Sequence, residues 1–147
     1  MKAIFLIFML ALVATKLLDA VALLNNRLPE LSIFGKKYKL IKIFRIDPEM
    51  LGSQRKPFAA FVFSLYLGIL IFSVGLVMSN LTFLLFIGSS IAGLSFVAYG
   101  AYGIYKKEII SPTKICQYGP EAIATSIVYI LLGMCFIAGT IYAIYKK

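Results

Sequence analysis

Residues 58–105 read FAAFVFSLYLGILIFSVGLVMSNLTFLLFIGSSIAGLSFVAYGAYGIY, without a charged side chain. Two apolar runs, 58–78 and 81–105, flank the pair Ser79-Asn80 in this stretch. Each run supplies the roughly 20 helical residues needed to cross a hydrocarbon core of about 30 Å. Because two residues connect them, the runs predict a tight antiparallel pair of transmembrane helices.

Two further apolar runs, 3–24 and 122–145, complete a set of four predicted spans. Pro57 and Pro120 stand near the starts of the second and fourth spans, where a missing amide hydrogen costs nothing. The chain is 61% hydrophobic and 14% charged, with a mean hydropathy of +0.94, whereas soluble domains are about half apolar and about a quarter charged. We therefore predict an all-α, antiparallel up-down, integral membrane four-helix bundle that forms one transmembrane domain over residues 1–147.

The basic residues predict how this bundle is oriented. Eleven lie in the first and third connections between spans: Arg27, Lys36, Lys37, Lys39, Lys42, Arg45, Arg55, Lys56, Lys106, Lys107 and Lys114. The other four are Lys2, Lys16, Lys146 and Lys147. Under the positive-inside rule this bias places the basic loop 25–57 in the cytoplasm and both termini outside. In a prokaryote the membrane would be the inner membrane.

The N-terminal run also has features of a secretory signal peptide. Lys2, an apolar run over 3–14 and Ala20-Val21-Ala22 resemble the charged, hydrophobic and small-residue regions of such a segment. Lys16 and Asp19 would be an unusual spacer before a cleavage site. We expect residues 3–24 to be a retained span, with cleavage as the alternative.

Lys16 and Asp19 are the ionisable residues inside an apolar run. They are three residues apart, so on a helix they share a face and can form an intramembrane ion pair, which lowers the cost of burying either charge. One hypothesis makes them a proton or ion relay. The other makes them a structural pair near the cytoplasmic interface, where a lysine stem reaches water.

The basic residues of segment 33–46 are arranged more regularly than the orientation of the spans requires. Large apolar residues alternate there with basic ones, in a pattern compatible with an amphipathic helix on the bilayer surface. A strand is less favoured, because a lone strand has no sheet to join. The predicted lipid or partner surface comprises Lys36, Lys37, Lys39, Lys42, Arg45, Phe34 and Phe44.

Small residues recur at helical spacing within three of the spans. Such residues let helix backbones approach closely where lipid removes the hydrophobic drive for association. The predicted packing positions are Ala60, Ser64, Gly68, Gly75, Gly93, Gly100, Ser126, Gly133 and Thr140.

Chemical motifs are scarce. The sequence has no histidine and two cysteines, so it lacks the commonest general base and metal ligand and cannot build a four-cysteine site. We predict no catalytic residue, no metal site, no cofactor and no enzyme. The net charge of +9 would suit nucleic acid in a soluble protein. Here it flanks apolar spans, so the expected partners are anionic headgroups of the inner leaflet and other membrane protein subunits or a second copy, not nucleic acid.

Three classes of function follow from these features. The first is a non-catalytic accessory subunit or protein-interaction component, such as a toxin-immunity protein, which apolar spans with small-residue stripes fit best. The second is a small oligomeric pore or transporter, which would need a polar stripe through the bundle. The third is a membrane-embedded enzyme, which would need acid, base or metal groups that this chain barely supplies.

Overall fold

Four long helices dominate the computed structural model of the protein, which describes residues 2–25, 30–33, 36–39, 52–77, 82–111 and 116–145. Each is long and apolar enough to cross a membrane. Their ends fall within about one turn of the predicted spans, which confirms the four-helix, all-α prediction for this part of the chain. They are α1 (Lys2–Leu24), α3 (Arg55–Val77), α4 (Phe83–Lys106) and α5 (Pro120–Tyr145).

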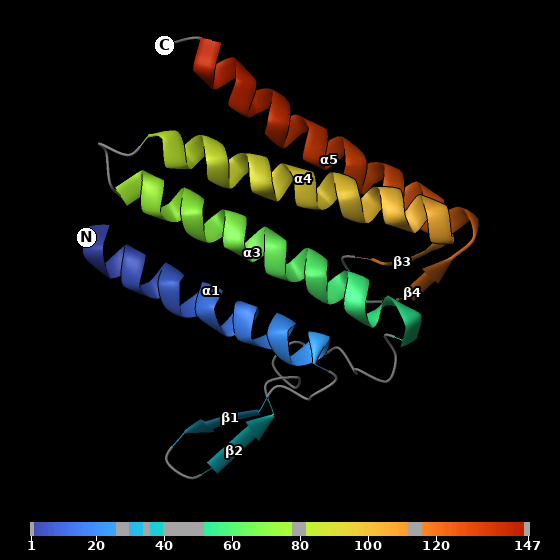
Figure 1. The fold of residues 1–147 in the computed structure, drawn as a ribbon, viewed down its shortest axis with the longest axis horizontal. Coiled ribbons are helices and arrows are strands. Elements are labelled where there is room, and N and C mark those ends of the chain that lie inside the picture. The colour runs from blue at the N-terminus through green and yellow to red at the C-terminus, as the bar shows by residue number, and fades with distance from the viewer. Residues whose placement is uncertain are drawn as a thin grey trace.

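The bundle is an open row of helices. Helix α1 packs on α3, α3 on α4, and α4 on α5. Figure 1 shows the four helices side by side in chain order, with the N- and C-termini at the same end of the bundle. Each inner helix thus has a neighbour on both sides, while α1 and α5 flank the row.

Glycines set the close contacts within this row. A methyl group on Gly68 of α3 would lie 2.8 Å from the backbone of Ala92 and Gly88 in α4, and one on Gly88 would overlap the backbone of Phe72. On the other side of α4, a methyl on Gly93 would lie 2.9 Å from the carbonyl oxygen of Gly133 in α5. Backbone approaches this close leave no room for a side chain.

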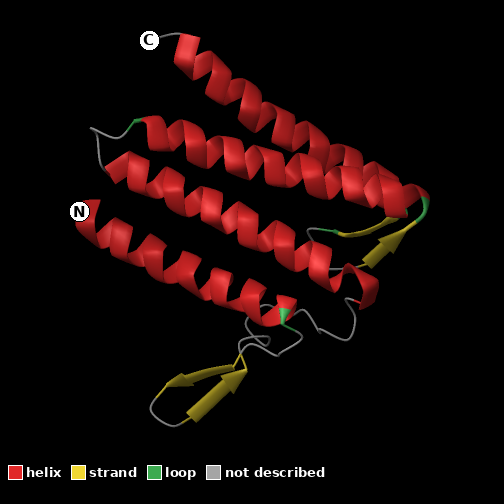
Figure 2. Ribbon diagram, viewed as in Figure 1, coloured by secondary structure: helices red, strands yellow, loops and turns green. Residues whose placement is uncertain are grey.

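The basic loop contains a β-hairpin where we predicted a helix. Strands β1 (Glu30–Ile33) and β2 (Lys36–Lys39) pair antiparallel, and Glu30 lies opposite Lys39 (Figure 2). The predicted amphipathic helix is therefore wrong at Ile33 and over 36–39. Its other residues, 34–35 and 40–46, lie outside the described part. The prediction rejected a strand because a lone strand has no partner. Residues 30–33, which were not considered as a strand, form β1 and hydrogen-bond to β2.

A second hairpin, which the sequence did not predict, lies in the connection between α4 and α5. Strands β3 (Glu108–Ile110) and β4 (Cys116–Tyr118) pair antiparallel. Ile109 and Ile110 are fully buried and pack near an aromatic cluster of Phe61, Tyr99 and Tyr129. The rings of Phe61 and Tyr99 are stacked with their centroids 4.5 Å apart. This cluster joins α3, α4 and α5 at the hairpin end of the layer.

Two tyrosine hydroxyls form hydrogen bonds with the backbone of Ile110, on the edge of β3 that does not pair with β4. Gly119 N–H donates to the carbonyl of Lys107 at 2.9 Å, so residues 107 and 119 are a hydrogen-bonded pair. Along antiparallel strands such pairs alternate with pairs that share no hydrogen bond. Ile110, opposite Cys116, belongs to the second kind, so its backbone N–H and carbonyl point away from β4. Its N–H donates to the hydroxyl of Tyr99, and its carbonyl accepts from the hydroxyl of Tyr129, both at 3.2 Å. Burial of β3 therefore leaves neither backbone group of Ile110 unsatisfied.

Candidate functional site

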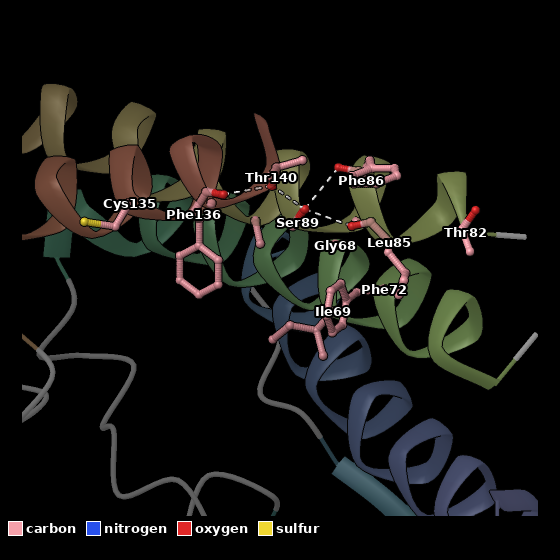
Figure 3. Close-up of a pocket in the computed structure, with 13 residues that line it drawn as sticks. Gly68, Ile69, Phe72, Thr82, Leu85, Phe86, Ser89, Cys135, Phe136 and Thr140 are labelled. Carbon is pink, nitrogen blue, oxygen red and sulfur yellow. Dashed lines mark hydrogen bonds between the residues drawn. The ribbon is translucent and has the colours of Figure 1, made fainter. Parts of the chain in front are cut away.

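An apolar groove lies over α4, between α3 and α5. It has a volume of about 510 Å³. Figure 3 shows α4 with Leu85 and Ser89, α3 with Ile69 and Phe72, and α5 with Cys135 and Phe136. The ring of Phe136 is stacked on that of Phe96, with the centroids 6.1 Å apart, and Phe96 packs against the aromatic cluster. On α4 the groove is lined by residues 85–92, near the start of the helix, whereas β3 follows the end of α4, so the groove lies in the half of the layer away from β3.

Two of the hydroxyl groups that line this groove, those of Ser89 and Thr140, are hydrogen-bonded. Ser89 of α4 and Thr140 of α5 form a hydrogen bond of 2.7 Å across the helix interface. One of the two hydroxyls donates to the other, and the second hydroxyl then donates to the carbonyl one turn back in its own helix, which is Leu85 for Ser89 and Phe136 for Thr140. The groove consequently offers a polar ligand little beyond backbone-satisfied hydroxyls, and its chemistry suits an apolar occupant.

Gly139 differs from the other glycines of the long helices. Those others, Gly68, Gly75, Gly88, Gly93, Gly100, Gly103 and Gly133, would all place a methyl group against a neighbouring element. A methyl on Gly139 would meet no described atom within 4 Å, and Gly139 lines the groove. Since glycine within a helix costs about 0.5–1 kcal/mol relative to alanine, close approach by an external backbone would account for it.

The groove runs along α4, between α3 and α5. Helix α4 has α3 on one side and α5 on the other, each packed against it. A helix laid over α4 between these two walls would contact all three, at the 8–10 Å axis separations usual for packed helices. Such an addition would turn three members of the row into a closed four-helix arrangement.

The pair Lys16 and Asp19 lies elsewhere, in the contact between α1 and α3. Asp19 is 5% exposed, and neither carboxylate oxygen has a hydrogen-bond partner among the described residues. Lys16 acts electrostatically on this carboxylate from one turn away. Near the same end of α1, the guanidinium of Arg55 donates to the carbonyl of Leu23 at 3.2 Å, which satisfies one of the free carbonyls at the helix C-terminus.

The predicted basic surface is described only in part. Lys36, Lys37 and Lys39 belong to strand β2. Lys42, Arg45, Phe34 and Phe44 lie outside the described residues.

The small residues predicted for packing are distributed over several contacts. Gly68 and Gly75 of α3 face α4, and Gly93 and Gly100 of α4 face α5. Gly133 of α5 faces α4. Ser126 is buried and would block a side chain at Gly103. Thr140 makes the hydrogen bond to Ser89. Ala60 and Ser64 instead line a second, smaller cavity.

A polar contact that the sequence did not indicate joins the two connections at the hairpin end. Glu108 of β3 accepts hydrogen bonds from the hydroxyl of Ser53 at 2.8 Å and from the side-chain amide of Gln54 at 3.1 Å. The hydrogen bond from Gln54 and that from Ser53 lower the pKa of Glu108 below its ordinary value of 4.5, with the nearby Lys106 acting in the same direction. The contact fixes the start of α3 beside β3.

Within the described residues, no group of three or more His, Cys, Asp or Glu side chains could hold a metal ion. Cys116 and Cys135 are not joined by a disulfide. Comparisons with protein-family models, with curated proteins and with solved structures find no match for this chain. The features at hand are therefore four helices able to cross a membrane and an apolar groove over α4.

Proposed function

We propose that the protein is a non-catalytic accessory subunit of a membrane assembly, or an interaction component of the immunity type, that binds a transmembrane helix of another membrane protein. The groove over α4 is the proposed binding site. The open face at Gly139 carries this proposal, because among the described residues Gly139 is the glycine of the long helices whose added methyl group would meet no neighbour. An apolar helix with a small residue at the contact would fit there.

The proposal places the chain in a membrane as a multi-pass protein with both termini outside. The inner side would carry the basic loop 25–57 and the connection 107–119. The positive-inside bias supports this orientation. Anionic headgroups of the inner leaflet are then the proposed lipid partners.

A pore or transporter is the alternative, and the hydroxyl groups weigh against it. Each lies within hydrogen-bond distance of a backbone carbonyl one turn back in its own helix, and they are divided among separate sites instead of one continuous path. The six are Ser64, Ser73, Ser89, Ser95, Ser126 and Thr140. A single row of helices also encloses no lumen of its own, so conduction would require several copies. The buried carboxylate of Asp19 is the observation that favours transport.

Purification from native membranes in mild detergent tests the proposal. The wild-type chain is compared with Gly139→Leu, which fills the groove, and with Ile141→Phe, which adds bulk at nearly the same depth. Residue 141 is two positions from 139, so it lies about 200° around the helix. The proposal expects a membrane protein that co-purifies with the wild type and Ile141→Phe and is lost with Gly139→Leu. Equal recovery with all three would contradict it.

A further inference from the structure

The second cavity lies between α3 and α4, near the end that carries the hairpins. Its volume is about 350 Å³, and its lining combines apolar and hydroxyl side chains: Ala60 and Ser64 from α3, and Ser95, Ala98 and Tyr102 from α4. It is separate from the groove. The two share no lining residue: on α3, residues 57–64 line the cavity and residues 68–72 line the groove.

Two lysines stand one turn beyond this cavity. Lys56 precedes Ala60 by four residues, and Lys106 follows Tyr102 by four, so each lies on the cavity's side of its helix. Both are exposed. The Lys106 ammonium lies 5.4 Å from the centroid of the Tyr105 ring. The carboxylate near it, Glu108, is held by Ser53 and Gln54.

We propose that this cavity binds one anionic phospholipid, with its phosphate between Lys56 and Lys106 and an acyl chain against Ala60 and Ala98. Charge complementarity selects this occupant. A zwitterionic headgroup would gain less from two ammonium groups, and an apolar helix would leave both lysines unmatched. The inference rests on the membrane placement proposed above but not on the groove or its partner.

The test measures lipid binding to the full chain in detergent micelles. The probes are fluorescently labelled phosphatidylglycerol and phosphatidylcholine with identical acyl chains. The double variant Lys56→Gln with Lys106→Gln is compared with Lys36→Gln with Lys37→Gln, which removes the same charge from strand β2. With about 1 kcal/mol for each basic residue near an anionic headgroup, we expect phosphatidylglycerol affinity to fall about thirtyfold in the first variant. It should change less than about twofold in the second.

A variant without a charge change separates the cavity from general attraction. Ala98 is exposed and lines the cavity, so Ala98→Phe should fill it and weaken phosphatidylglycerol binding while the fold is kept. Equal losses in the two double variants would overturn the proposal, as would equal binding of the two lipids by the wild type. Loss of a co-purifying protein without loss of lipid binding in Lys56→Gln with Lys106→Gln would assign the lysines to an acidic protein segment, which also overturns it.

Discussion

The hydroxyl of Tyr129 in α5 donates to the backbone carbonyl of Ile110 in β3 at 3.2 Å. Both residues are buried, at 7% and 0% exposure. The bond crosses from a long helix to the connection that precedes it. It therefore makes the second hairpin part of the packed layer and not a free surface loop.

Replacing Tyr129 by Phe should destabilise this end of the protein. The carbonyl of Ile110 would lose its side-chain partner in a buried position, which costs about 1–3 kcal/mol. Denaturant unfolding in micelles measures the change. Tyr145→Phe is the matched control, because Tyr145 is 87% exposed. Equal stability of the two variants would argue against the Tyr129 contact.

Two glycines should respond oppositely to alanine. Gly139→Ala should raise the free energy of unfolding by about 0.5–1 kcal/mol, since helix propensity improves and no described atom is met. Gly88→Ala should lower it by about 1–3 kcal/mol, because the methyl group overlaps the backbone of Phe72. The same unfolding experiment measures both. Destabilisation by Gly139→Ala in the isolated chain would mean that Gly139 is already packed.

The contact of Glu108 should give the stability a defined dependence on pH. Its pKa in the folded protein is lowered by hydrogen bonds from Gln54 and Ser53, so its contribution is complete above about pH 4.5. The contribution is lost as the pH falls through the lowered folded-state pKa. Thermal unfolding of wild type and Glu108→Gln should differ at pH 7 and converge toward pH 3. A difference that stays constant over this range would refute the role of the carboxylate.

The register of the first hairpin can be tested by disulfide formation. Ser32 lies opposite Lys37 in the pairing of β1 with β2, and opposed Cα atoms in antiparallel strands are about 4.5–5.5 Å apart, within reach of a disulfide. With Cys116 and Cys135 changed to Ser, Ser32→Cys with Lys37→Cys should oxidise readily. Ser32→Cys with Lys36→Cys should not. The reverse order would favour a helix, in which residues four apart share a face.

The four long helices were predictable because the apolar runs of this chain have sharp ends. The uncharged stretch 58–105 and the prolines at 57 and 120 determine where α3, α4 and α5 can lie. The hairpins were not predictable in the same way. Gly35 between two short β-compatible runs was the available signal for the first, and the buried pair Ile109-Ile110 was too short to indicate the second.

The groove could not be found from the sequence, because it depends on which helices pack together. The glycines of α3, α4 and α5 have similar spacing, yet Gly133 faces α4 whereas Gly139 faces open space. Helical periodicity places them on different sides of α5 but does not say which side α4 occupies. Ala60 was predicted as a packing position for the same reason, and it lines a cavity.

The most direct test of the docking groove is photo-crosslinking in native membranes. A benzophenone amino acid is placed in turn at positions 135 and 139, which line the groove, and at 134 and 141, which are exposed on another side of α5 at similar depth. We predict one adduct with a different membrane protein from 135 and 139, and none from 134 and 141. Adducts of equal yield from all four positions, or an adduct of twice the chain's own mass from the groove positions, would contradict an accessory role.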